Sequence, residues 1–348
     1  MKVVTTRSFP RAGFLGNPSD GYFGKTMSFV FADYCVVLTL TESAKMRFVP
    51  GEVDDATFDS PRKLVRDIRL YGYYGGIRML KAVAKLFFEY CFDHGIELPE
   101  QNFTAEYRTN IPRLVGLSGS SAICSAMLKA LMKFYSVDIP LEYTPTICLE
   151  AEKLELGINC GFQDRVVQMY NGLVFMDFEK SFVEANNRGL YERLDPKLLP
   201  NVYVAFDPNR AEESGKAHKK VKRLFEEKRP DILAAMTEFA DIAQKGRDAL
   251  VSGRADLIPD LVNANFDLRD RIFNVAELNR NMVMAARESG ASAKFAGSGG
   301  AIVGTYEDDA QYENLKARLA SIGCTTLKPN IVTSDDNPVA VNGVWRNS

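Results

Sequence analysis

One stretch of the chain has the composition of a phosphate-binding loop: Gly116-Leu117-Ser118-Gly119-Ser120-Ser121. Its two glycines permit backbone conformations that a side chain would block, so successive amide N–H groups can turn toward one anion. Ile123, Met127 and Leu131 follow at helical spacing, so we expect a helix from about Ser121 whose first N–H groups favour phosphate. The serine hydroxyls can meet phosphate oxygens or magnesium. The alternative is a turn before a serine-capped core helix.

Two carboxylates downstream are spaced so that they can meet. Glu152 lies in a segment expected to be helical over residues 145–157, and Asp164 follows a glycine-bearing turn just before an expected helix over 166–170. A turn between two helices allows both side chains to face one site. The alternative is that Glu152 lies on a solvated helix face, that Asp164 caps a helix and that Arg165 forms a surface salt bridge.

Two further loops carry residues suited to a ligand. The segment from Arg11 to Lys25 joins two expected strands and carries more charge than a turn needs, although a plain hairpin is the alternative. The segment 290–304 is a second glycine/serine loop, which can close a cleft opened by the first; alone it is equally compatible with a packing turn.

Composition excludes several classes of function. The chain has 348 residues, of which 46% are hydrophobic and 25% are charged, and this composition is typical of a folded globular protein. Its net charge of −2 provides no overall positive charge that would attract nucleic acid. No apolar run is long enough to cross a membrane, and we expect a cytoplasmic location. The six cysteines include no Cys-x-x-Cys pair, which argues against a zinc site or a disulfide framework. With two histidines in the chain, a histidine-based metal site or a Ser-His-Asp triad is also disfavoured.

The remaining pattern predicts two mixed α/β lobes. We expect strands over 27–40, 103–107, 172–178 and 202–206, a helix over 77–90, charged helices up to residue 253, and an amphipathic helix over 257–273. The polar segment 184–194 is expected to cross between the lobes. We therefore predict a first lobe over residues 1–190 and a second over 191–348.

Taken in order, these motifs resemble those of the GHMP kinases, and within them the plant-type glucuronokinases. The matching segments are Gly13 to Asp20, Gly72 to Gly76, Asn110 to Pro112, Gly116 to Ala122, Phe162 to Arg165, Asn265 to Arg269 and Lys294 to Ala301. One feature departs from most of the wider family and is shared with the plant-type pattern. Two residues, Ser118 and Gly119, stand where most members have a single glycine.

The resemblance implies a fold and an activity. It implies an α+β, two-lobed GHMP kinase fold, with a ribosomal-protein-like βαβ N-terminal lobe and a ferredoxin-like C-terminal lobe. It also implies transfer of the γ-phosphoryl group of ATP, with Mg²⁺, to the anomeric hydroxyl of D-glucuronate. The alternatives are another GHMP sugar kinase, acting on galactose, arabinose or a heptose phosphate, or a catalytically silent sugar sensor. Oligomeric state stays open.

The resemblance also assigns roles to residues. Asp164 would accept or orient the sugar hydroxyl proton, and Arg11 would stabilise the Asp164 carboxylate and the transferred phosphoryl group. Amides of Gly116, Leu117, Ser118, Gly119, Ser120 and Ser121 would hold phosphate, and Glu152 with Ser120, or alternatively Ser121, would hold Mg²⁺. The acceptor carboxylate calls for a cation, either Arg165 or Lys25. The expected substrate-side contacts are Asn17, Ser19, Asp20, Lys25, Arg165, Gly297, Ser298, Gly299 and Gly300.

Overall fold

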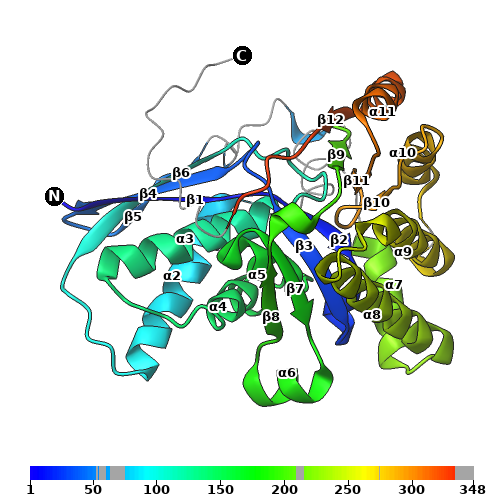
Figure 1. The fold of residues 1–348 in the computed structure, drawn as a ribbon. Helices are drawn as coiled ribbons and strands as arrows, with labels where there is room; N and C mark the ends of the chain where they lie inside the picture. The colour runs from blue at the N-terminus through cyan, green and yellow to red at the C-terminus, as the bar shows by residue number, and fades with distance from the viewer. Residues whose placement is uncertain (52–53, 55–59, 63–74, 209–214, 274, 334–348) are drawn as a thin grey trace.

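A computed structural model describes the chain except residues 52–53, 55–59, 63–74, 209–214, 274 and 334–348 (Figure 1). The segment 72–76, which carries one of the family-like motifs, therefore lies largely outside the described residues. In the rest of the chain the strands form three four-stranded sheets. The expected mixture of helices and sheets in two lobes is confirmed, and Figure 1 shows the helices that lie between residues 215 and 321 gathered on the right of the molecule.

The first lobe contains two of the sheets. One has the order β1-β4-β6-β5, with only β5 parallel to its neighbour; its strands are β1 (Val3–Ser8), β4 (Val36–Ser43), β6 (Asn102–Thr109) and β5 (Arg47–Phe48). The other has the antiparallel order β2-β3-β7-β8; its strands are β2 (Arg11–Leu15), β3 (Lys25–Val30), β7 (Leu173–Asp177) and β8 (Leu190–Leu194).

Two expectations about these strands are wrong. The strand expected over 27–40 is divided between β3 and β4, because the chain turns at Ala32 and Asp33 and enters the other sheet. The segment 184–194, expected to cross between lobes, contains the end of α6 (Lys180–Asn186) and β8, which pairs with β7. The second sheet of the first lobe therefore extends past the boundary proposed at residue 190.

Helix α3 is the central helix of the first lobe. It spans Gly119–Tyr135, contacts β1, β4 and the neighbouring helices, and buries nearly all of its apolar side chains. Its depth in the core fixes the position of the loop that precedes it. The other helical segments around it are α2 (Gly76–Asp93), α4 (Thr144–Glu150), the π-helical turn η3 (Ala151–Glu155) and α5 (Gln163–Tyr170).

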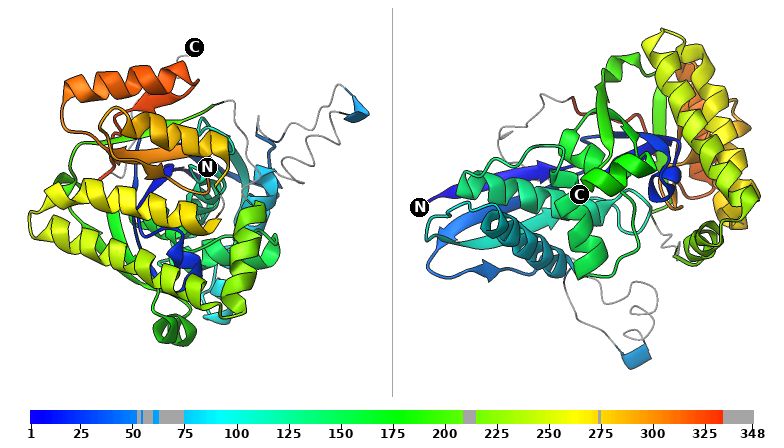
Figure 2. Two further views of the ribbon diagram at one scale, coloured as in Figure 1. Left: turned by 90° about the vertical axis from the view of Figure 1, so that its right-hand side faces the viewer. Right: turned by 90° about the horizontal axis from the view of Figure 1, so that it is seen from below.

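The second lobe is built on an antiparallel sheet with the order β10-β11-β9-β12. Its strands are β9 (Val202–Phe206), β10 (Lys294–Phe295), β11 (Ala301–Thr305) and β12 (Thr325–Leu327). Helices α8 (Pro230–Val251) and α9 (Ile258–Phe273) pack side by side and cover β3 and β2 of the first lobe (Figure 2). The helices are α7 (Gly215–Glu226), α8 (Pro230–Val251), α9 (Ile258–Phe273), α10 (Glu277–Arg287) and α11 (Asp309–Ser321).

A C-terminal segment returns to the first lobe. Ala32 N donates to Asn330 O at 2.8 Å, and Val332 N donates to Val30 O at 3.1 Å. Val332 is buried in a small apolar cluster with Phe9 and Val30. Residues far apart in the sequence therefore pair at the end of β3, where the chain leaves the sheet. None of the helices described here is long and apolar enough to span a bilayer.

Asn265, on α9, joins the lobes through buried hydrogen bonds. Its Oδ1 accepts from Gly16 N at 2.6 Å, and its Nδ2 donates to Asn17 O at 3.1 Å. Truncation of this side chain leaves two buried backbone groups without partners, and each such group costs about 1–3 kcal/mol.

We expect Asn265→Ala to lower the free energy of unfolding by about 2–4 kcal/mol, measured by urea denaturation. Asp267→Ala is the matched control, because Asp267 lies on the same helix as Asn265 but is exposed and forms an ion pair with Arg287 of α10. It should cost about 1 kcal/mol or less. Equal, small effects of both variants would contradict this role of Asn265.

Candidate active site

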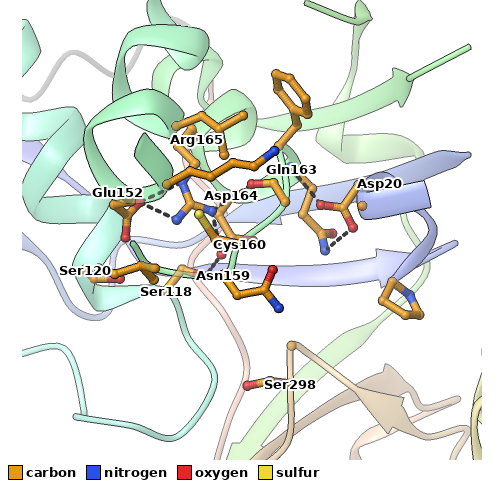
Figure 3. A pocket seen from close by; sticks show the side chains of 18 of the residues that line it. Asp20, Ser118, Ser120, Glu152, Asn159, Cys160, Gln163, Asp164, Arg165 and Ser298 are labelled. Carbon is orange, nitrogen blue, oxygen red and sulfur yellow. Dashed lines mark hydrogen bonds and ion pairs between the residues drawn. The ribbon is translucent and has the colours of Figure 1, made fainter. Parts of the chain in front are cut away.

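A cavity of about 940 Å³ lies where the two lobes meet, a volume ordinary for a small-molecule site. Its walls come from segments that are distant in the sequence. They include the loop between β2 and β3, the loop before α3, the turn before α5, and the glycine/serine loop after β10. In Figure 3, Glu152, Asp164 and Asp20 lie along one side of the pocket and Ser298 lies across from them.

The loop before α3 has the backbone geometry expected of a phosphate cradle. Gly116 has a φ of +78°, and a Cβ there would lie 2.4 Å from Gly299 O, so a side chain would collide with the opposing loop. Helix α3 begins at Gly119, so the unpaired N–H groups of its first turn lie next to the loop that lines the cavity. Residues 116–120 line the cavity, whereas Ser121 is buried and donates to Ser118 O at 3.2 Å.

Asp164 lies in the first turn of α5, which begins earlier than expected, at Gln163. Arg11 Nε donates to its Oδ1 at 2.6 Å, and Ser118 Oγ donates to its Oδ2 at 2.7 Å. Burial raises the pKa of Asp164, but the charges of Arg11 and Arg165 and these two hydrogen bonds outweigh burial and hold the pKa below its usual value. The side chain is thus a carboxylate that faces the cavity.

Arg11 contacts both glycine-rich loops as well as Asp164. Its Nη1 donates to Gly116 O at 2.8 Å and to Ala296 O at 2.9 Å. Because a buried cation needs several acceptors, this one side chain fixes the two loops relative to the carboxylate. The expected pairing of Arg11 with Asp164 is present in the structure.

Glu152 lies in the π-helical turn η3 and is fully buried, so the alternative of a solvated helix face is wrong. Arg165 Nε donates to Glu152 Oε2 at 2.7 Å, Nη2 also bonds Oε2, and Nη1 donates to Gly161 O at 2.9 Å. The alternative of a surface salt bridge for Arg165 is wrong too. Arg165 bridges the two acidic groups, since its Nη1 also lies 3.6 Å from Asp164 Oδ2.

Asp20 brings another carboxylate to the cavity. Backbone N and Nε2 of Gln163 both donate to it at 3.2 Å. A Cβ on Gly161 would lie 2.0 Å from Asp20 Oδ2, which explains the glycine in the turn before α5. Burial, together with the negative charge of Asp164, raises the pKa of Asp20 to about 6. Near neutral pH both the ionised and the protonated form of Asp20 are therefore accessible. The side chain can accept a hydrogen bond from a ligand hydroxyl in the first form and donate one in the second.

Asn17 also reaches the cavity, and a buried lysine holds it. Lys294 Nζ bonds Asn17 Oδ1 and donates to Gly13 O at 2.6 Å and to Phe295 O at 2.9 Å. Gly297, Ser298 and Gly299 line the cavity opposite.

Three expected ligand contacts do not line the cavity. Lys25 Nζ lies 3.0 Å from Asp177 Oδ2 and donates to Gln244 at 2.9 Å, so its charge is used elsewhere. Ser19 Oγ donates to Lys25 O at 2.8 Å. Gly300 packs against the backbone of Val115, since a Cβ there would lie 3.0 Å from Val115 Cα.

Several site features escaped sequence reasoning. The Ser118–Asp164 hydrogen bond, the Gln163–Asp20 contact, the buried Lys294 and the cavity-lining Lys222 and Arg269 depend on how distant segments meet. One signal was available: Gln163 precedes Asp164 directly, and a polar residue at the start of a helix facing a site is a candidate contact.

Comparisons with known proteins support the resemblance to the GHMP kinases. The GHMP kinases N-terminal domain matches residues 78–172. The chain is 45% identical over 308 residues to Probable glucuronokinase 2 of Arabidopsis thaliana, and 43% identical over 307 residues to Glucuronokinase 1 of that plant; each alignment covers 86% of this chain and 84% of the relative.

A solved structure of Lactococcus lactis galactokinase complexed with galactose has the same fold. The TM-score is 0.72 at 15% identity, and the match covers 95% of this chain and 94% of that one. The two-lobed α+β architecture expected from the motifs is therefore that of solved kinases. With this fold and the identity to the two plant relatives, the chain belongs to the glucuronokinase-like branch of the GHMP kinases.

Proposed function

We propose that this chain transfers the γ-phosphoryl group of ATP to the anomeric hydroxyl of D-glucuronate, giving glucuronate 1-phosphate and ADP. The observation that carries the proposal is the placement of the Asp164 carboxylate in one cavity with the phosphate cradle of α3. The identity to two plant glucuronokinases supports the choice of acceptor.

An assay of the purified chain with ATP and a panel of sugars tests the proposal. We expect kcat/KM for glucuronate to exceed that for galactose, arabinose or a heptose phosphate by at least about 100-fold, since a site built for a polar group strongly rejects ligands that lack it. Product analysis should find phosphate on the anomeric oxygen. A comparable kcat/KM for an uncharged hexose would overturn the choice of acceptor, and no phosphate transfer to any sugar would overturn the kinase.

The phosphates of ATP would occupy the loop before α3. The backbone amides from Gly116 to Ser120 and the start of α3 offer N–H donors and the positive end of a helix dipole. Ser298 and its flanking glycines would approach from the other lobe. Enclosure between the two loops keeps water from competing as the acceptor.

Glu152 has the features of a magnesium ligand. Within the described part of the chain, its Oε1 is buried and has no hydrogen-bond partner, while its Oε2 is bound by Arg165. Carboxylate, hydroxyl and phosphate oxygens suit Mg²⁺, so we propose that Glu152 and Ser120 hold the ion. When bound, Mg²⁺ would neutralise charge on the transferred phosphoryl group. Ser120 suits this role better than Ser121, because Ser120 lines the cavity whereas Ser121 is buried and does not line it.

Asp164 would act on the acceptor hydroxyl. The sugar oxygen forms a bond to the γ-phosphorus, the bond from that phosphorus to the bridging oxygen of ADP breaks, and the hydroxyl proton passes to Asp164. Arg11, permanently charged, would keep Asp164 ionised and stabilise negative charge on the phosphoryl oxygens. Asn17 and Asp20 would bind the sugar hydroxyls.

We expect Asp164→Asn to lower kcat by about 10²–10⁴-fold, because the base is lost while the shape of the side chain is kept. ATP affinity, measured by calorimetry, should change little. Asp177→Asn is the control, since Asp177 pairs with Lys25 outside the cavity, and it should leave turnover unchanged. Near-normal turnover of Asp164→Asn would remove Asp164 from catalysis.

A cation other than the two expected from the sequence is better placed to bind the acceptor carboxylate. Lys25 does not line the cavity and pairs with Asp177, and Arg165, although it lines the cavity, is engaged by Glu152. Arg269, which also lines the cavity, donates to Gly297 O at 2.9 Å and to Ser298 O at 3.2 Å. A free ammonium group is available on α7, where Lys222 is exposed and lines the cavity; the ion pairs of the described residues do not include it.

The position of Lys222 favours the sugar end of the cavity. Phe225, three positions later and on the same face of α7, packs edge-on against Tyr22 with ring centroids 5.0 Å apart. Tyr22 follows Asp20 by two residues, so this face of α7 borders the proposed sugar contacts. We propose that Lys222 binds the glucuronate carboxylate.

We expect Lys222→Met to raise KM for glucuronate about tenfold, the loss expected for one hydrogen bond to a charged group, with KM for ATP unchanged. Lys220→Met is the matched control, because Lys220 is exposed on the same helix and does not line the cavity. Steady-state kinetics with both substrates make the comparison. A glucuronate KM within twofold of the wild-type value would exclude Lys222 as the carboxylate partner.

A further inference from the structure

Ser118 stands out within the phosphate loop because its hydroxyl turns away from the loop. Ser118 Oγ donates to Asp164 Oδ2 at 2.7 Å, on the oxygen opposite the one held by Arg11. We propose that Ser118 is a positioning residue for Asp164 rather than a phosphate ligand. This inference rests on the phosphoryl transfer proposed above, in which Asp164 receives the proton.

The backbone of Ser118 has an unusual conformation that serves this bond. Its φ of 61° and ψ of 43° lie in the left-handed region, which glycine adopts far more easily than serine. A side chain kept in that region points to a function of the side chain. Here the only hydrogen bond described for the Ser118 hydroxyl is the one to Asp164.

Helix α5 holds Ser118 from two sides. Asp164 binds the Ser118 hydroxyl, and Gln168, one turn later on the same face, donates from Nε2 to Ser118 O at 3.0 Å. Gln168 Nε2 also donates to Phe9 O at 3.0 Å. Ser118 O accepts further bonds from Ser121 Oγ at 3.2 Å and from Ala122 N at 3.1 Å. The backbone of Ser118 is therefore fixed, and its side chain can only be used where it is.

Fixing both carboxylate oxygens sets the orientation of the base. Arg11 Nε holds Oδ1 of Asp164. Arg165 Nη1 lies 3.6 Å from Oδ2, too far for a hydrogen bond, so the Ser118 hydroxyl supplies the hydrogen bond to Oδ2 that defines the carboxylate plane. Each carboxylate oxygen can accept more than one hydrogen bond, so Asp164 can still receive the acceptor hydroxyl. The phosphate loop and the base are thereby held at a set separation before ligands bind, which favours an aligned transfer.

Ser118→Gly tests the proposal without damage to the fold. We expect kcat to fall at least about tenfold. KM for ATP should stay within about twofold. The melting temperature should be unchanged or higher, since glycine accepts the left-handed conformation. Ser118→Ala, which also lacks the hydroxyl, should lose kcat by a similar factor.

A double-mutant cycle separates positioning from other roles. If Ser118 acts through Asp164, Ser118→Gly should have no further effect on the residual rate of an Asp164→Ala variant, measured with radiolabelled ATP. A raised KM for ATP, additive losses in the cycle, or an unchanged kcat would each overturn the proposal. If the wild-type chain transferred no phosphate to sugar, the proposed function itself would fail, which is a different result from a wild-type rate in Ser118→Gly.

Discussion

The site depends on one buried cation. The Arg11 guanidinium contacts the Asp164 carboxylate, the Gly116 carbonyl and the Ala296 carbonyl, which come from three different parts of the chain. A guanidinium removed from water is stable only if its donors are satisfied, so the three acceptors must converge on it. The convergence brings two glycine-rich loops and an acidic helix start to one point. The cavity is the space that this arrangement leaves open between the lobes.

Much of the fold follows from local sequence pattern. Apolar residues at helical spacing predicted α3 and α9, and alternating or continuous apolar runs predicted β6, β7 and β9. The errors arose where pairing, not propensity, decides the structure. An unbroken β-rich run was divided because Asp33 lies in a turn between two sheets, and the polar segment 190–194 became a strand because β7 offered it a partner. A single sequence does not show which strands have an unpaired edge that another segment can join.

The candidate site was predictable at the level of segments and less so at the level of atoms. Glycine spacing identified both loops, and Arg11, Asp164 and Asp20 lie together as the motifs implied. The partners of the cations were not predictable. Lys25 and Arg165 are equally basic in the sequence, but Asp177 engages one outside the cavity and Glu152 engages the other within it. Tertiary packing decides which carboxylate neutralises which cation, and the spacing of residues along the sequence does not reveal that packing.

The return of residues 330–332 to β3 has a consequence for the order of events during synthesis. Asn330 and Val332 pair with Ala32 and Val30, although the whole second lobe is made between them. As the chain leaves the ribosome, the residues at the end of β3 therefore lack these hydrogen-bond partners until the second lobe has been translated. The two lobes are separate in architecture but not in assembly, because the first reaches its final form only after the second exists.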